Sequence, residues 1–214
     1  MNPTIELLGV RAGYLPGQDV LHDVNLSIGP GLTQLTGANG SGKSTLLEVM
    51  AGTLRIRSGS ALLAGHPVHT RPAWQVRSVC SAGVALFPGL TVDEHASLLQ
   101  VADVADRLRC EQRMAAYGLQ PWLDVPVGEL STGNLRKAWI VLSTAAERPV
   151  VLLDEPFTGL DVDGVAVLVR EVAEWQHSGR TVVLVTHQPV SGLDADQVVD
   201  AATLGREAVT NDQL

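Results

Sequence analysis

Apolar residues follow two spacings along this chain, and the two spacings predict strands and helices in turn. Short apolar runs bounded by glycine, proline or polar residues are typical of strands, whereas apolar residues three or four positions apart are typical of helices. The expected strands span residues 4–10, 21–28, 31–36, 59–64, 76–80, 150–153 and 181–186, with an edge strand and turn over 197–209. The expected helices span residues 44–50, 93–117, 136–146 and 162–175.

The order of these elements predicts an α/β fold. Strands that alternate with helices form a mostly parallel sheet with helices on both faces. The first two strands are instead joined by the turn-forming residues Gly13, Pro16 and Gly17, which favours an antiparallel β portion at the N-terminus. We therefore expect one domain over residues 1–214, with a helical subdomain over approximately 86–146 inserted in the α/β core.

The expected helix at 93–117 carries the strongest helical spacing in that insertion. Its apolar positions are expected on one face, opposite Asp, Glu and Arg residues. They are Leu98, Leu99, Val101, Val104, Ala105, Leu108 and Met114.

Composition and charge narrow the classes of function. The formal charge of −8 disfavours binding to nucleic acid through a basic face, and it disfavours direct adhesion to anionic lipid. No N-terminal signal and no apolar stretch long enough to cross a bilayer is visible, so we expect a soluble, intracellular chain. Cys80 and Cys110 do not form a C-x-x-C pair and are expected to be reduced, structural thiols.

A glycine-rich segment between the third strand and the first helix matches the phosphate-binding loop pattern of two glycines, a lysine and a hydroxyl. It reads Gly37-Ala38-Asn39-Gly40-Ser41-Gly42-Lys43-Ser44-Thr45. Glycines let backbone N–H groups turn onto phosphate oxygens, and the following helix adds its positive end. Lys43 would reach the terminal phosphates and the Ser44 hydroxyl would ligate Mg²⁺. A chance glycine-rich turn is the competing interpretation, and the flanking strand and helix count against it.

Two carboxylates end the apolar strand 150–153. The carboxyl ends of strands in an open parallel sheet face the ligand crevice, where the phosphate loop also lies. Asp154 would hold Mg²⁺ opposite Ser44, and Glu155 would polarise the attacking water. The alternative is a turn of Asp, Glu and Pro that merely ends the strand.

The motif order resembles the ATPase subunits of ABC transporters over essentially the whole chain. Their signature, usually LSGGQ, is similar to Leu130-Ser131-Thr132-Gly133-Asn134, which stands upstream of Asp154 and Glu155 at the family's spacing. A serine and glycine before a helix supply a second anion site. The resemblance implies that Ser131, Thr132, Gly133 and Asn134 close over the γ-phosphate held by a partner, in a head-to-tail ATPase dimer with two ATP molecules.

Three further residues match the family one by one. Tyr14 stands where the family has an aromatic residue that stacks on adenine, although a surface tyrosine is the alternative. Asp161, in Gly159-Leu160-Asp161, resembles the D-loop that crosses the dimer interface. His187, after the strand 181–186, resembles the switch histidine that contacts the γ-phosphate.

Two departures from the family pattern stand out. The position of the family's glutamine, which ligates Mg²⁺ and the attacking water, is Ala82 here. Ser81, backbone or water would have to substitute, or turnover would be slow, or coupling to the partner would be altered. Thr132 and Asn134 are milder changes. Because Glu155 and His187 are present, an active ATPase is favoured over a silent one.

The resemblance implies an ATP-binding and ATP-hydrolysing subunit that energises transport, with export favoured, through separate membrane-spanning subunits. ATP and Mg²⁺ would be the cofactors. The partners would be transmembrane permease subunits and a second ATPase, without nucleic acid, at the cytoplasmic face of the membrane. Two alternatives stay open: a soluble ABC-type ATPase that assembles or remodels a complex, and a nucleotide-binding regulatory subunit with little turnover.

Overall fold

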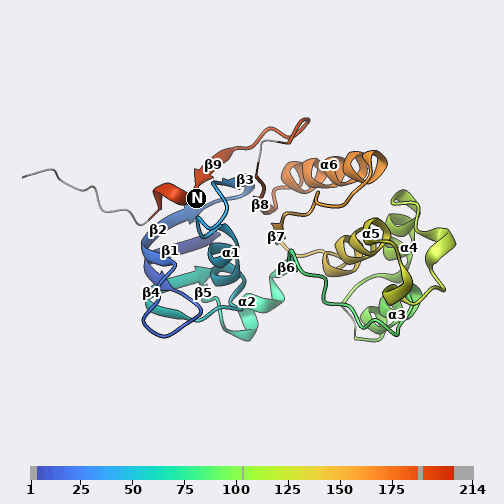
Figure 1. Ribbon diagram of the computed structural model, residues 1–214, viewed down its shortest axis with the longest axis horizontal. Coiled ribbons are helices and arrows are strands. Elements are labelled where there is room, and N and C mark those ends of the chain that lie inside the picture. Colours follow the sequence, from blue (N-terminus) through green and yellow to red (C-terminus); the bar gives the residue numbers. More distant parts are fainter. Residues whose placement is uncertain (1–3, 103, 188–189, 205–214) are drawn as a thin grey trace, which may run out of the picture.

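The computed structural model describes residues 4–102, 104–187 and 190–204, which contain two β-sheets and the helices around them (Figure 1). The first sheet is antiparallel, with the strand order β2-β1-β4-β5. Its strands are β1 (Ile5–Ala12), β2 (Leu21–Ile28), β4 (Ile56–Leu63) and β5 (His66–Pro67). The expected antiparallel pairing of the first two strands is confirmed.

The second sheet is parallel throughout its described strands, in the order β6-β7-β8-β3-β9. Its strands are β3 (Gly31–Thr36), β6 (Arg77–Cys80), β7 (Val150–Asp154), β8 (Thr181–Val185) and β9 (Gln197–Asp200). Every residue of β7 and β8 is buried, as expected for central strands covered on both faces. The edge position of β9 is confirmed. The strand ends at Asp200, however, and the turn η3 (Ala201–Thr203) follows; the rest of the expected 197–209 segment, from residue 205, lies outside the described residues.

Helix α1 (Lys43–Ala51) lies between the two sheets and contacts strands of both. Leu46, Leu47 and Met50 are fully buried there, in one core with residues of β1, β2, β4, β7 and β8. α6 (Val162–His177) packs against β3 and β8 on the other face. The parallel sheet therefore has a helix on each side, which agrees with the expected α/β fold.

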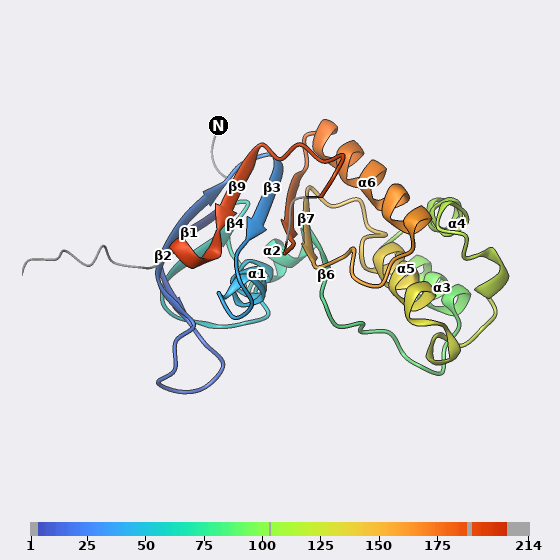
Figure 2. The same cartoon turned by 45° about the horizontal axis from the view of Figure 1, so that its top comes forward.

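Helices α3 (Val92–Val101), α4 (Arg107–Ala116) and α5 (Thr132–Ser143) contact one another and gather at one end of the molecule (Figures 1 and 2). Shorter helical turns complete the chain: α2 (Arg71–Gln75), η1 (Gln120–Trp122) and η2 (Val127–Glu129). None of the helices in the described ranges combines the length and apolarity that a membrane span needs. The description of residues 86–146 as an insertion within one domain stays a prediction.

The expectation of one helix over 93–117 is wrong. α3 ends before Ala102, and α4 begins after Asp106, whose carboxylate accepts hydrogen bonds from the backbone N–H groups of Leu108 and Arg109. This N-cap starts a new helix in a new direction. The expectation that these residues share one apolar face is wrong too, because Met114 is buried whereas Leu98, Val101 and Leu108 are largely exposed.

The bounds of one strand and one helix differ most from expectation. β4 begins at Ile56 and contains Gly59, whose backbone has a φ of 84°. A Cβ there would lie 2.4 Å from the Gly9 carbonyl oxygen, so the glycine permits a close crossing of β1 rather than starting the strand. α5 begins at Thr132 rather than 136, because the Ser131 side chain caps it, and it ends at Ser143.

Candidate nucleotide-binding and hydrolysis site

The loop between β3 and α1 has the backbone that a phosphate cradle requires. Gly37, Gly40 and Gly42 have φ values of 136°, 77° and 95°, a region that favours glycine. A Cβ at Gly37 would lie 2.7 Å from Ser41 Oγ, and one at Gly42 would lie 3.1 Å from a Leu21 methyl group. Side chains at Gly37 and Gly42 would therefore crowd the loop, whereas at Gly40 the backbone conformation alone favours glycine.

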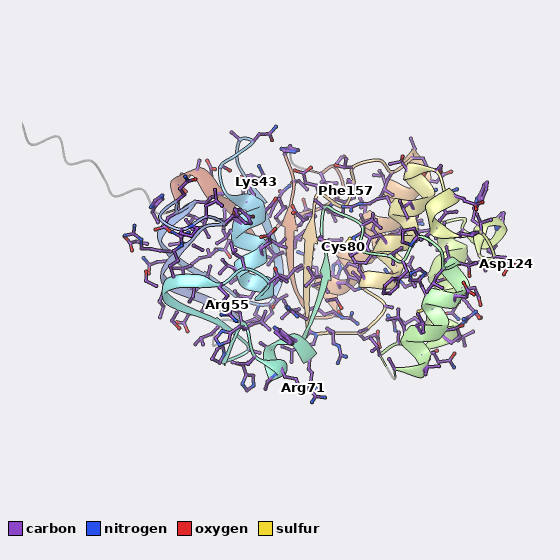
Figure 3. The ribbon with its side chains drawn as sticks, turned by 60° about the horizontal axis from the view of Figure 1, so that its bottom comes forward. Lys43, Arg55, Arg71, Cys80, Asp124 and Phe157 are labelled. Carbon is purple, nitrogen blue, oxygen red and sulfur yellow. The ribbon has the colours of Figure 1, made fainter. Side chains whose placement is uncertain are left out.

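Lys43 is buried and folds back into this loop. Its Nζ donates to the carbonyl oxygens of Gly37 at 2.7 Å and Ala38 at 3.0 Å. Figure 3 shows Lys43 at the start of α1. The buried Ser41 Oγ has no hydrogen-bond partner among the described residues. A confined ammonium and an unpartnered hydroxyl in one glycine-rich loop are a suitable environment for phosphate oxygens.

The remaining residues of the predicted nucleotide site lie around this cradle. Asn39 is exposed on the loop, and Ser44 is exposed in the first turn of α1. The Tyr14 hydroxyl lies 3.3 Å from Thr45 Oγ1, so the structure brings the predicted aromatic residue next to α1. Its ring is largely exposed and available for stacking.

Asp154 ends β7 with a carboxylate that is only partly satisfied. The residue is 5% exposed, and its Oδ1 has no hydrogen-bond partner among the described residues. Burial raises the pKa of Asp154, and a hydrogen bond from Ser44 partly opposes that rise. The structure therefore brings the two predicted Mg²⁺ ligands together. A buried, unpartnered carboxylate oxygen beside a hydroxyl is a donor set that fits Mg²⁺.

Glu155 and His187 also meet. His187 Nε2 lies 2.7 Å from Glu155 Oε1, at the adjacent ends of β7 and β8. Glu155 has a φ of 45°, which costs a non-glycine residue about 1–2 kcal/mol. Its N–H donates to the Val185 carbonyl at 3.0 Å, which holds the strained residue to the next strand. Such strain is typical of functional positions.

The signature residues lie away from the phosphate loop of their own chain. Ser131 Oγ accepts a hydrogen bond from the Asn134 N–H at 3.3 Å, while Ser131 and Thr132 are exposed. Gly133 approaches the next motif, because a Cβ there would lie 3.1 Å from the Gly159 carbonyl oxygen. Figure 1 shows α1 and α5 separated by the strands β6 and β7. The structure does not bring the two phosphate-binding motifs of one chain together.

Asp161 connects the D-loop segment to α5. Its Oδ1 accepts from the Gly164 N–H at 2.8 Å and caps α6, and its Oδ2 lies 2.7 Å from Lys137 Nζ. The hydrogen bond from Lys137 holds the pKa of Asp161 below its ordinary value. The segment that the sequence assigned to the dimer interface is thus tied to the helix that follows the signature.

Sequence reasoning missed Arg136, which the structure places at the centre of this arrangement. Its guanidinium donates to backbone carbonyls at the ends of β6 and β7, including those of Ala82 and Glu155. The only sequence signal was a charged residue amid the buried positions of α5. Of the substitutes proposed for the missing glutamine, Ser81 is already engaged, because its Oγ donates to the Gly83 carbonyl at 2.7 Å.

Comparison with known proteins assigns the family. The family model described as "ABC transporter" matches residues 21–158. The chain belongs to this family. A second model, described as "AAA domain, putative AbiEii toxin, Type IV TA system", matches residues 123–194.

Relatives and solved structures agree with this assignment. The chain is 37% identical to the cytochrome c biogenesis ATP-binding export protein CcmA 1 of Salmonella paratyphi A, over 82% of this chain and 84% of that protein. It is 34% identical to CcmA of Escherichia coli K12, over 74% of this chain and 76% of that protein.

Among solved structures, the ATP-binding subunit of an ABC transporter is 27% identical, with a TM-score of 0.77 over 86% of this chain and 79% of that one. The dimeric structure of MJ0796, a bacterial ABC transporter cassette, shares the fold, with 21% identity and a TM-score of 0.79 over 94% and 97% of the two chains. The protein is therefore the ATP-binding subunit of an ABC transporter, an ATPase with the expected P-loop α/β fold.

Proposed function

We propose that this chain is the Mg²⁺-dependent ATPase of an export system of the type used in cytochrome c biogenesis, bound to the cytoplasmic face of a membrane through permease subunits. The identity of 37% to a cytochrome c biogenesis ATP-binding export protein, over most of both chains, is the observation that carries this proposal. The formal charge of −8 disfavours direct adhesion to anionic lipid, which supports attachment through partner subunits.

We infer the catalytic roles from the contacts that the site residues make. Lys43 and the N–H groups of the loop bind the β- and γ-phosphates. Asp154 and Ser44 would hold Mg²⁺, which supplies charge neutralisation of the phosphate oxygens when it is bound. Glu155 accepts the proton of the attacking water, and His187 orients the Glu155 carboxylate through their contact at 2.7 Å.

The exposed signature supports a head-to-tail dimer. Ser131 and Thr132 are exposed at the positive end of α5. The phosphate loop of their own chain lies on the other side of β6 and β7 (Figure 1). A second chain in a two-fold arrangement would bring its own phosphate loop to this helix end, and the two contacts would be equivalent. The MJ0796 cassette, which has the same fold, is described as dimeric, which supports a dimer of this chain.

An apolar groove beside the signature helix offers a docking surface for a permease. The groove has a volume of about 550 Å³ and lies between α2, β6, α3 and α5. Trp74, Phe87 and Leu98 line it with largely exposed side chains, and Arg77 and Arg148 are its cations. An exposed apolar surface with basic groups fits a short cytoplasmic helix that carries apolar and acidic side chains.

Co-purification from membranes in mild detergent tests the proposal. The wild-type chain should be recovered with a membrane-embedded partner, and Leu98→Asp should lose it. Leu108→Asp is the matched control, because Leu98 and Leu108 are 52% and 61% exposed and only Leu98 lines the groove. Recovery of an active ATPase in the soluble fraction, with no membrane partner, would instead support a remodelling ATPase.

A further inference from the structure

Arg136 is a buried cation at the junction of three functional segments. It is 5% exposed and stands on α5, shortly after the signature residues. Its Nη1 donates to the carbonyl oxygens of Ser81 and Ala82, both at 3.0 Å. Its Nη2 donates to those of Asp154 at 2.9 Å and Glu155 at 2.8 Å. One side chain on α5 thus holds the carboxyl ends of both β6 and β7.

These bonds are well suited to a guanidinium. Its N–H groups are fixed in a planar fork, so two nitrogens can each bridge two carbonyls of one strand end. A buried charge is costly unless its donors are satisfied. In the described part of the chain every hydrogen bond from Arg136 goes to a backbone carbonyl. The strand ends are therefore held in the spacing that the fork requires.

The bond to Glu155 acts on a strained residue. The Glu155 carbonyl accepts from Arg136, while its N–H donates to Val185, so both of its peptide groups are held. Its φ of 45° sets the direction of a side chain that meets His187 at 2.7 Å. The backbone conformation of Glu155 sets where its carboxylate lies. A change in that conformation would therefore move the carboxylate.

The bonds to Ser81 and Ala82 connect the same arginine to the loop that leads to the groove. Trp139, almost one turn further along α5, also donates from Nε1 to the Ser81 carbonyl at 3.0 Å. The Ala82 side chain has no atom that could ligate a metal. Arg136 and Trp139 on α5 hold this loop through its backbone carbonyls. The loop continues to Phe87, which lines the groove.

We propose that Arg136 is a positioning residue that orients Glu155 and links its position to α5 and the loop 81–83. The inference rests on the proposed role of Glu155 as the base. Arg136 acts through backbone carbonyls and does not touch the nucleotide. In this arrangement a shift of the signature helix or of the groove loop reaches the catalytic carboxylate through a single side chain.

The test compares Arg136→Met, Arg136→Lys, Arg113→Met and Glu155→Gln with the wild type. Arg113 is the matched control: it is a second largely buried arginine, on α4, and it pairs with Glu171 rather than with the site. For each variant, kcat and KM for ATP hydrolysis, ATP affinity by calorimetry and the melting temperature are measured.

Arg136→Met should lower kcat by about 10- to 100-fold, because displacing a catalytic group by up to about 1 Å has effects of that order. KM and ATP affinity should stay within about twofold, since the phosphate loop is intact. Arg136→Lys should recover part of kcat, because an ammonium can reach one strand end but lacks the fork. Arg113→Met should lower the melting temperature while kcat per folded molecule stays within about twofold of the wild type.

A wild-type kcat in folded Arg136→Met would overturn the inference. If that variant does not fold, a wild-type kcat in Arg136→Lys would overturn it instead. An equal loss of kcat in Arg113→Met would also overturn it, because the effect would then be a general loss of packing. If Glu155→Gln keeps the wild-type kcat, the proposed base is wrong and the inference falls with it. If only the Arg136 variants keep the wild-type kcat, the inference is wrong but the proposed base stands.

Discussion

The two ends of this molecule differ in how far their own chain brings the functional groups together. At the nucleotide end, Lys43 bonds to its own loop and His187 meets Glu155. At the helical end, the signature residue Ser131 and the groove residues Phe87 and Leu98 are exposed. One end is assembled by the fold, whereas the other presents surfaces that fit other molecules.

This difference separates binding from turnover. A single chain holds the groups for ATP binding, but the second anion site and the groove gain a function only in an assembly. Substitutions at the nucleotide end should therefore act on an isolated chain, and substitutions at the helical end should act through partners.

Glu155→Gln should have the largest effect. Removing the base should lower kcat by about 10²- to 10⁴-fold, while ATP affinity is kept because the phosphate loop is unchanged. Steady-state hydrolysis measures kcat, and trapping of ATP in a persistent dimer measures whether ATP binding is kept. Asp163→Asn, an acid in the first turn of α6 outside the site, is the control. Turnover of Glu155→Gln at the wild-type rate would remove Glu155 from the mechanism.

Lys43→Ala should weaken ATP binding itself. The loss of a buried charge that faces phosphate is worth about 1.5–3 kcal/mol, which is about 10- to 100-fold in affinity. Calorimetry on the isolated chain measures it. Lys137→Ala, which breaks the contact with Asp161 at α6, should leave this affinity unchanged. Equal affinities of Lys43→Ala and the wild type would place Lys43 outside the site.

Asp154→Asn should stabilise the nucleotide-free protein at neutral pH. The pKa of Asp154 is raised in the folded state, so its ionised form costs stability above that pKa, and the cost disappears as pH falls toward the ordinary value near 4. Neutralising the buried oxygen should therefore gain roughly 1 kcal/mol at pH 7 and nothing at the acid end.

Thermal melts at both pH values, with and without Mg·ATP, check this expectation. The variant should lose the additional stabilisation that Mg²⁺ brings to ATP binding. An Asn variant that is less stable than the wild type at pH 7 without nucleotide would show that the Asp154 carboxylate has a partner in solution.

Ala82→Gln should have the smallest effect, a rise in kcat of the isolated chain of roughly a few-fold, if a missing Mg²⁺ ligand limits turnover. If water already completes the metal shell, isolated activity should stay flat and only partner-stimulated activity should change. Measuring the two activities side by side distinguishes these accounts. A fall in both would show that the loop 81–83 has another role.

Local patterns predicted the nucleotide end well. The strand, glycine loop and helix around Lys43 follow one another in sequence, and the geometry of the loop depends on residues within it. The pairing of Ser44 with Asp154 also followed, because parallel strands end at the same edge.

The helical end was predicted less well for physical reasons. The apolar spacing continues across residues 102–106, but α3 has already ended at Val101 and Asp106 caps the start of a second helix. Arg136 was missed because its partners are carbonyls, which every residue has, in segments remote along the chain. Sequence identifies a charge that is out of place in an apolar pattern, but only the fold shows what holds it.

Mixing two inactive variants tests the central claim, that each hydrolysis site is shared between two chains. Lys43→Ala disables the phosphate loop of one chain. Ser131→Arg fills the signature site of the other chain with a bulky side chain and leaves the phosphate loop of that chain intact. In an equimolar mixture, half of the dimers would combine the variants, and each would keep one of two sites intact. With independent sites the mixture should reach about a quarter of the wild-type ATPase rate. A rate no higher than the mean of the separate variants would contradict the shared site and favour hydrolysis within a single chain.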